Sequence, residues 1–93
     1  MAFEWDQTKN DKNIEKHGID FDDAISIFRT DHHVFRSDRG GEERFVAIGD
    51  MEAGLTIAVI FTVREQRIRV ISARRAKLSE ERTYRQKISE RDS

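Results

Sequence analysis

The sequence predicts an α+β fold in a single domain over residues 1–93, with an antiparallel meander sheet of three to five strands, two N-terminal helices and one C-terminal helix. Three observations predict it. The chain has 93 residues, which is too short for two globular domains. Two aspartates near the N-terminus each precede a segment with helical character. A long apolar run in the second half of the chain is flanked by segments in which apolar and polar residues alternate.

The first two elements are a short edge strand and a helix. Phe3 and Trp5 alternate with acidic residues, which predicts the strand. Asp6 is well suited to cap a helix over Gln7–His17. Gly18 ends this helix, because glycine readily adopts the left-handed conformation just beyond a helix C-terminus.

A second helix follows directly. Asp20 can cap it, and its apolar residues Phe21, Ala24, Ile25 and Phe28 fall at positions i, i+3, i+4 and i+7. This spacing places the four side chains on one face of a helix, so we expect them in the core.

The middle of the chain predicts a meander of strands. His33–Arg36 is a short strand, and Ser37–Gly41 is a turn because it concentrates serine, aspartate and glycine. Arg44–Gly49 is the next strand, and Asp50–Gly54 closes a hairpin. Leu55–Val63 is the most apolar run, as expected of a central strand that is covered on both faces.

The last strand and helix complete the fold. Arg64–Gln66 turns the chain into a strand over Arg67–Ala73, whose Ile68 and Val70 point to one face while its arginines at 67 and 69 point to the other. Ser79 is the expected cap of a terminal helix that begins at about residue 80.

Composition excludes several classes of protein. There is no cysteine, so the chain can form no disulfide, no thiolate zinc site and no cysteine nucleophile. The longest apolar run, Leu55–Phe61, is far shorter than the roughly 20 residues that span a bilayer. With no basic leader and no apolar signal segment at its start, the chain is expected to be cytoplasmic and to have no membrane partner.

Charge is divided unevenly along the chain. Residues 1–61 carry 7 basic and 13 acidic side chains, whereas residues 62–93 carry 10 basic and 5 acidic ones. Five arginines lie within twelve residues, and their mutual repulsion is typical of a surface that meets phosphates or a carboxylate-rich partner. Ion pairing with carboxylates of the helices is the alternative interpretation. The five are Arg64, Arg67, Arg69, Arg74 and Arg75.

Three other side chains are candidates for acid–base work. His17, at a predicted helix end, can titrate near neutral pH, although a histidine there can equally cap the helix or pack on Trp5. Tyr84 could stack on a base or hold a phosphate oxygen, and Glu80 could accept a proton or orient an arginine. Helix packing and exposed ion pairing are the alternatives for these two.

The sequence predicts no metal site. His32 and His33 are adjacent, so their side chains alternate across a strand and do not converge easily on one ion. With Asp31 they match no recognised ligand spacing. We therefore expect neither a metal nor another cofactor.

Three segments of the chain carry a recognisable pattern of residues. The first contains Phe3-Glu4-Trp5-Asp6, Lys9, Asn13, Lys16-His17-Gly18 and Phe21; the second contains Glu43-Arg44, Ile48-Gly49, Phe61-Thr62 and Arg64; the third contains Arg67 to Arg74, Ala76, Glu80 and Tyr84. The Lys-His-Gly and Ile-Ser-Ala-Arg sequences at their observed spacing are the most specific parts. Together the three segments, over roughly residues 3–84, resemble the BrnT toxin family of bacterial toxin–antitoxin systems.

The resemblance implies a RelE-like fold and a metal-independent RNA endonuclease that inhibits translation. It also implies a cognate antitoxin of the BrnA type, which binds DNA and neutralises the toxin, so that the chain meets DNA only through the antitoxin complex. The family often has an arginine directly after the position of Glu80, whereas this chain has Glu81. That acidic residue makes this helix face less basic than the family pattern.

The resemblance also implies roles for individual residues. Arg64 and Arg74 would be active-site arginines, with Glu80, Tyr84 and His17 as further catalytic residues. The other basic residues of the segment would bind RNA: Arg67, Arg69, Arg75 and Lys77.

Such a site would use the chemistry of RNA itself. The 2′-hydroxyl attacks the neighbouring phosphorus in line, and arginines stabilise the charge that develops on the phosphorane. The proton transfers would fall to Glu80, His17, Tyr84 or the geometry of the substrate. The alternative function is a non-catalytic binding module, whose basic C-terminal half docks nucleic acid or an acidic protein partner.

Overall fold

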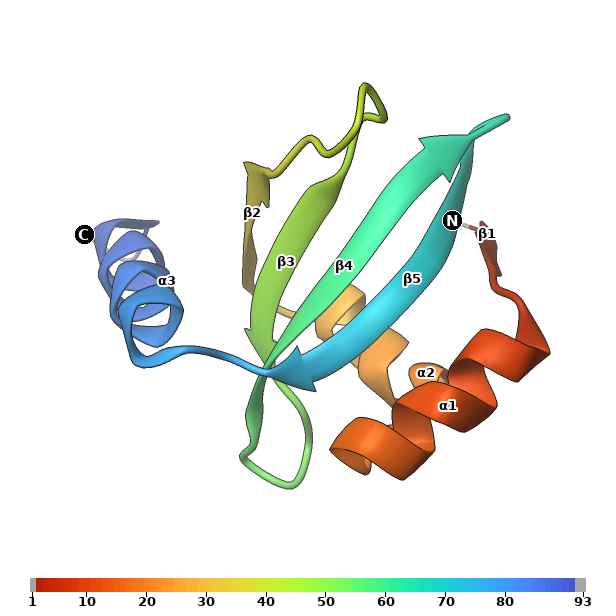
Figure 1. The fold of residues 1–93 in the computed structure, drawn as a ribbon. Helices are drawn as coiled ribbons and strands as arrows, with labels where there is room; N and C mark the ends of the chain where they lie inside the picture. Colours follow the sequence, from red (N-terminus) through yellow and green to blue (C-terminus); the bar gives the residue numbers. More distant parts are fainter. Residues whose placement is uncertain (1, 92–93) are drawn as a thin grey trace.

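A five-stranded sheet organises the computed structural model, which describes residues 2–91 (Figure 1). The strands lie in the order β1-β5-β4-β3-β2, so the apolar strand β4 is central, as predicted. The strands are β1 (Ala2–Glu4), β2 (His32–Arg36), β3 (Phe45–Asp50), β4 (Thr56–Arg64) and β5 (Arg67–Arg75). The helices are α1 (Gln7–His17), α2 (Phe21–Ala24), the 3₁₀ helix η1 (Ile25–Arg29) and α3 (Leu78–Arg91).

The α+β class is confirmed, but the sheet is mixed and not purely antiparallel. Strands β2 to β5 form the predicted antiparallel meander, whereas β1 runs parallel to β5, with Glu4 opposite Arg69. The alternation of Phe3 and Trp5 indicates a strand but carries no information about its direction. Because β1 is joined to β5 through most of the chain and not by a hairpin turn, nothing local forces the two strands to be antiparallel.

The predicted caps of the N-terminal helices are confirmed. The carboxylate of Asp6 accepts hydrogen bonds from the backbone N–H groups of Thr8 and Lys9, at 2.8 and 3.3 Å. Gly18 has a φ of 71° and donates its N–H to Ile14 at 2.8 Å, which closes α1. These local contacts set the length of α1.

The second helix departs from the predicted arrangement. After Ala24 the chain tightens into the 3₁₀ helix η1, so a stripe with α-helical spacing does not continue. Ile27 is fully buried, whereas Ile25 and Phe28 are half-buried. Ile27 approaches the sheet closely at Gly49. If residue 49 had a Cβ atom, that atom would lie 2.9 Å from the Cβ of Ile27. Glycine at position 49 therefore allows η1 to pack directly on β3.

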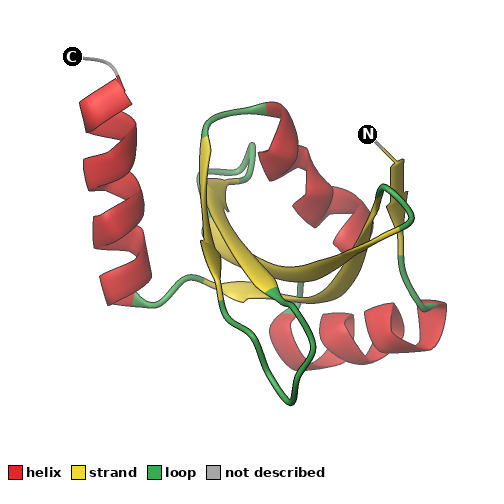
Figure 2. Ribbon diagram, turned by 90° about the horizontal axis from the view of Figure 1, so that it is seen from above, coloured by secondary structure: helices red, strands yellow, loops and turns green. Residues whose placement is uncertain are grey.

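The two faces of the sheet bury different clusters. We call the inner face the one that packs under α1, α2 and η1, and it carries Val59 and Val70. The outer face carries Ile48 and Ala58, which pack against Tyr84 of α3. Figure 2 shows α3 on the side of the sheet opposite the other helices. Because α3 lies over β2 and β3, it leaves the outer face of β4 and β5 partly open.

A β-bulge changes the alternation in β5. Ser72 lies opposite Ile60, but Val70 lies opposite Phe61, so Ile71 is an extra residue in β5. Val70 and Ala73 are consequently both buried on the inner face although they are three residues apart. Strict alternation would have placed the side chain of Arg74 on the inner face, together with that of Val70. The bulge instead places Arg74 on the outer face, opposite Ala58.

The C-terminal helix begins earlier than predicted, at Leu78, and Ser79 is not its cap. The carboxylate of Glu80 accepts a hydrogen bond from the backbone N–H of Lys77 at 2.8 Å. This is the glutamate half of a capping box, in which the third helical residue reaches back to the residue before the helix.

Candidate functional site

Arg74 and Glu80 form the closest pair among the predicted site residues. Two guanidinium nitrogens of Arg74 donate to the two carboxylate oxygens of Glu80, at 2.8 and 3.0 Å. Both side chains are largely buried, with 24% and 12% of their surfaces exposed. The Arg74 guanidinium holds the pKa of Glu80 below its usual value, and the Glu80 carboxylate raises the pKa of Arg74. Glu80 is therefore a carboxylate at neutral pH, able to orient Arg74 or accept a proton.

Tyr84 lies one helical turn beyond Glu80, with its ring buried against the sheet. Its hydroxyl donates to the backbone oxygen of Asp31 at 3.3 Å and lies 3.5 Å from the carboxylate of Asp50. Burial is the main reason why the pKa of Tyr84 is raised, so the side chain is a neutral phenol.

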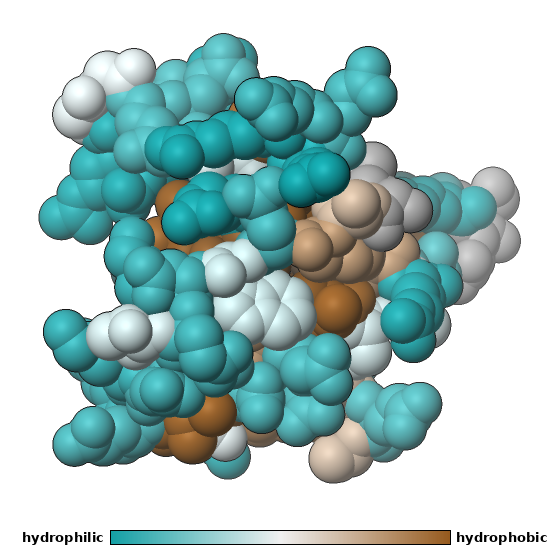
Figure 3. Space-filling view, turned by 90° about the vertical axis from the view of Figure 1, so that its right-hand side faces the viewer, coloured by the Kyte–Doolittle hydropathy of each residue, from teal (hydrophilic) through white to brown (hydrophobic). Residues whose placement is uncertain are grey.

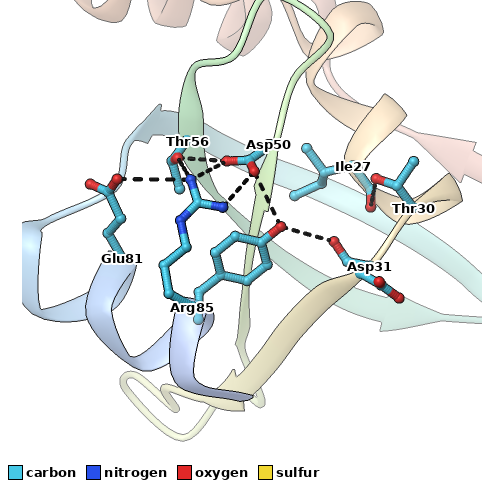
Figure 4. Close-up of polar contacts among 8 residues, drawn as sticks. Ile27, Thr30, Asp31, Asp50, Thr56, Glu81 and Arg85 are labelled. Carbon is cyan, nitrogen blue, oxygen red and sulfur yellow. Dashed lines mark hydrogen bonds and ion pairs between the residues drawn. The ribbon is translucent and has the colours of Figure 1, made fainter. Parts of the chain in front are cut away.

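An arginine that sequence analysis did not single out completes this network. Arg85 makes two hydrogen bonds to the carboxylate of Asp50, at 2.7 and 3.1 Å, and one to the hydroxyl of Thr56 at 3.0 Å (Figure 4). These bonds hold the pKa of Asp50 below its usual value. The network fastens α3 to the ends of β3 and β4.

Arg64, Arg67 and Arg69 gather at the opposite end of the outer face. Arg64 lies opposite Arg67 across the β4–β5 hairpin, and both are exposed. Arg69 forms an ion pair with Glu4 of β1 at 2.8 Å, and Arg67 reaches the same carboxylate at 4.0 Å. Among residues 2–91, Arg64 makes no ion pair within 4 Å, so its charge is available to a ligand.

The predicted catalytic residues do not converge on one point. Arg74 is opposite Ala58, six residues along β4 from Arg64, which corresponds to about 20 Å. His17 lies on α1, which packs on the other side of the sheet from α3. Arg75 and Lys77 are exposed where the chain leaves β5 for α3. The outer face therefore has two charged ends, and His17 lies apart from both.

His17 lies instead beside a lysine cluster that sequence analysis also missed. A hollow of about 190 Å³ between α1 and β5 is lined by Lys9, Lys12, Lys16, His17, Ile71 and Ser72, together with Asn13. The spacing i, i+3 and i+7 of the three lysines could have revealed that they share a helix face. The partnership of Arg69 with Glu4 had no comparable signal, because it depends on the pairing of β1 with β5.

The two adjacent histidines take different directions. His32 lies opposite Gly49 and His33 opposite Ile48, on opposite faces of β2, and a His32 ring nitrogen lies 2.7 Å from the backbone oxygen of Thr30. Within the described range, no group of three histidine or acidic side chains is arranged to hold a metal ion. None of the described helices is long and apolar enough to cross a membrane.

Comparison with known proteins identifies the family. The family described as the ribonuclease toxin BrnT of type II toxin–antitoxin systems matches residues 5–80. No curated protein matches the chain significantly. The crystal structure of the Brucella abortus ribonuclease toxin BrnT is similar to this chain, with a TM-score of 0.69 and 38% sequence identity, over 83% of this chain and 97% of that one. Tyr84 and most of α3 lie beyond the range of the family match. The chain belongs to the BrnT family of ribonuclease toxins of type II toxin–antitoxin systems.

Proposed function

We propose that this chain is a metal-independent RNA endonuclease that acts in the cytoplasm and inhibits translation by cleaving RNA. The observation that carries the proposal, beside membership of the family, is the exposed outer face of β4 and β5. Arg64, Arg67 and Arg69 stand there; the carboxylate of Glu4 lies within 4 Å of Arg67 and Arg69, whereas Arg64 forms no ion pair among the described residues. Guanidinium groups suit phosphate oxygens because they stay charged and present several donors in a fixed plane.

The arginines would act on the charge of the transition state. Attack of the 2′-hydroxyl on the adjacent phosphorus concentrates negative charge on the non-bridging oxygens, and a guanidinium held ready stabilises this charge. Arg64 is unpaired within the described chain, whereas Arg74 is fixed by Glu80. We assign Arg74 to the stabilisation of this charge, because Glu80 holds its guanidinium ready, and we assign Arg64, Arg67 and Arg69 to RNA binding.

An RNA strand lying along the outer face would reach from Arg64 to Arg74. At the second end, the cleaved phosphate would lie beside Arg74, Glu80 would orient Arg74 and accept the 2′ proton, and the neutral phenol of Tyr84 would donate a proton to the leaving 5′ oxygen. Arg75 and Lys77 would continue the phosphate-binding path beyond β5. His17 is proposed to meet the strand at the edge of β5.

The partner follows from the family. Type II toxins have protein antitoxins, and we propose that the antitoxin here resembles BrnA, binds DNA and lays carboxylates over the arginines of the outer face. RNA and antitoxin would then compete for the same guanidinium groups, and the toxin would contact DNA only within the antitoxin complex. Charge complementarity of this kind favours fast association.

The proposal is tested with purified protein and single-stranded RNA in EDTA. Cleavage that leaves a 2′,3′-cyclic phosphate or a 3′-phosphate is expected, and a single 2′-deoxy substitution at the cleaved nucleotide should prevent it. Loss of cleavage in EDTA, with recovery on adding Mg²⁺ or Zn²⁺, would contradict the metal-independent mechanism. Tight RNA binding with no cleavage in any buffer would favour the non-catalytic binding module.

A further inference from the structure

We propose that the hollow between α1 and β5 binds the backbone of single-stranded RNA, with one phosphate contact to each of the ammonium groups of Lys9, Lys12 and Lys16. The inference rests on the proposed ribonuclease function and adds a second contact region for the same substrate. This hollow, here called the α1–β5 hollow, is separate from the arginines of the outer face.

The three lysines have an uncompensated charge. All three are exposed, and none forms an ion pair within 4 Å in the part of the chain that the structure describes. Like charges three or four residues apart on a helix destabilise it by about 0.2–0.5 kcal/mol per pair. Lys9 also lies in the first turn of α1, which has no acidic residue and where the helix dipole disfavours a cation. An anion in the hollow would relieve both costs.

The helix that carries the lysines is held firmly against β5. The side chain of Asn13 donates to the backbone oxygen of Ala73 at 2.8 Å and accepts from its N–H at 3.1 Å. The same amide also donates to the backbone oxygen of Ile19 at 2.9 Å. Strand β1 pairs only with the first part of β5. Farther along β5, the side chain of Asn13 makes the hydrogen bonds to the backbone of Ala73 that a neighbouring strand would otherwise make. This fixes the position of the α1 backbone relative to the floor of the hollow.

The floor of the hollow is the bulge of β5. Ile71, the extra residue, and Ser72 both line it, and the hydroxyl of Ser72 lies 3.3 Å from the side-chain oxygen of Asn13. Bulges locally interrupt the ladder and occur frequently next to functional sites. His17, from the last turn of α1, lines the same hollow and offers a ring nitrogen to a phosphate or to the ribose 2′-hydroxyl.

The chemistry of the hollow favours RNA over an acidic peptide. Lysine binds phosphate as a point charge, whereas planar carboxylates are preferred partners of the arginine fork. A protein interface also needs apolar anchors near its centre, and Ile71 is the one large apolar residue that lines the hollow. The side of the molecule that carries β1 and α1 is largely hydrophilic, with apolar atoms confined to smaller areas (Figure 3).

The arginines already in place make the lysines more significant. Arg69 and Arg74 each have a carboxylate partner at 2.8 Å, so part of their charge is neutralised within the chain. The lysines of α1 therefore add unpaired charge next to β5. An RNA strand that crosses the free edge of β5 would contact the three lysines on one side and the outer face of the sheet on the other.

The test measures binding of an uncleavable 2′-O-methyl single-stranded RNA at a series of KCl concentrations. Replacing all three lysines, as Lys9→Gln, Lys12→Gln and Lys16→Gln, should lower the slope of log affinity against log salt by about 2, since each phosphate contact contributes about 0.7. The same relation gives a loss of affinity of about fivefold per lysine at 0.1 M salt.

A charge-matched control replaces three exposed arginines for which the structure shows no ion pair: Arg29→Gln, Arg39→Gln and Arg82→Gln. It should leave the slope nearly unchanged, and circular dichroism should show that both variants are folded. An equal effect of the two triple variants would overturn the site, as would a lysine variant that keeps RNA binding but loses the antitoxin. Because the RNA cannot be cleaved, this result stands whether or not the wild-type protein proves to be a nuclease.

Discussion

The guanidinium of Arg74 donates to both carboxylate oxygens of Glu80 and so joins the end of β5 to the first turn of α3. Glu80 at the same time accepts the backbone N–H of Lys77, which makes it both the ion-pair partner and the cap of α3. A pair that is bidentate and mostly buried stabilises the fold. Two of the predicted site residues therefore determine how the last helix leaves the sheet.

Removing either partner of this pair should destabilise the protein. We expect Glu80→Gln and Arg74→Gln each to lower the free energy of unfolding by about 1.5–3 kcal/mol, the usual value for hydrogen bonds to charged groups. Urea denaturation of the two single variants and the double variant measures the coupling. Additive losses would show that the two side chains do not stabilise the fold through each other.

Acid should weaken the attachment of α3. The pKa of Glu80 is lowered in the folded protein, mainly by its hydrogen bonds with Arg74, so its stabilising effect is complete above the ordinary pKa of 4.5. That effect is lost as the pH falls from 4.5 through the lower pKa that Glu80 has in the folded protein. Between pH 7 and pH 3, the melting temperature of Glu80→Gln should decrease less than that of the wild-type protein. Parallel curves would contradict the assignment.

Tyr84 can be tested by separating its hydroxyl from its ring. The hydroxyl makes only long hydrogen bonds, at 3.3 and 3.5 Å, so Tyr84→Phe should cost about 1 kcal/mol or less. If the phenol donates the proton to the leaving oxygen, the same variant should lose about 100-fold or more in cleavage rate. Full activity of Tyr84→Phe would leave the residue with a packing role alone.

Arg64 tests RNA binding on the outer face without a cost in stability. Its side chain is exposed and has no ion pair within the described chain, so Arg64→Gln should change stability by less than about 0.5 kcal/mol. Because Arg64 would contact a phosphate away from the cleaved bond, Arg64→Gln should weaken RNA binding about fivefold at 0.1 M salt, seen as a higher KM with kcat nearly unchanged. Arg39→Gln, an exposed arginine in the β2–β3 connection, is the control and should cleave RNA normally. A stable, fully active Arg64→Gln would remove Arg64 from the site.

The packing of η1 predicts a contrast between two neighbouring residues. Ile27 of η1 is fully buried against the sheet, so Ile27→Ala should cost about 2–5 kcal/mol. Phe28 is half-buried and lines an open apolar hollow of about 760 Å³. The helical spacing alone places Phe28 in the core, where Phe28→Ala would cost about 3–5 kcal/mol. Because the side chain is only half-buried, we expect the substitution to cost less than that. Guanidinium denaturation of both variants provides the comparison.

The parts of the fold that depend on neighbouring residues could be predicted from the sequence. Asp6 and Gly18 set the ends of α1 through contacts with residues at most four positions away, and the apolar composition of β4 marks it as central. The direction of β1 could not be predicted, because it depends on a strand more than 60 residues away. The 3₁₀ helix after Ala24 packs Ile27 close to Gly49, a contact that the local sequence does not reveal either.

The same distinction applies to the site. The cluster of arginines and the family motifs could be recognised residue by residue, but their partners could not. Arg69 meets Glu4 only because β1 pairs with β5, and Arg74 meets Glu80 only because the bulge turns it to the outer face. A motif records which residues are present, whereas the separation between Arg64 and Arg74 arises from the register of the sheet.

The extra residue at position 71 also has a consequence for changes in chain length. Ile71 and Ser72 together occupy one step of the ladder, between Val70 and Ala73. Deleting Ile71 would remove the bulge and leave every later residue on its present face, with Arg74 still opposite Ala58. Deleting one residue within the uninterrupted run Arg67–Val70 would instead turn every later side chain of β5 to the opposite face of the sheet. A relative that is one residue shorter here can thus keep the same arginine chemistry, and alignments in this region should place their gap at the bulge.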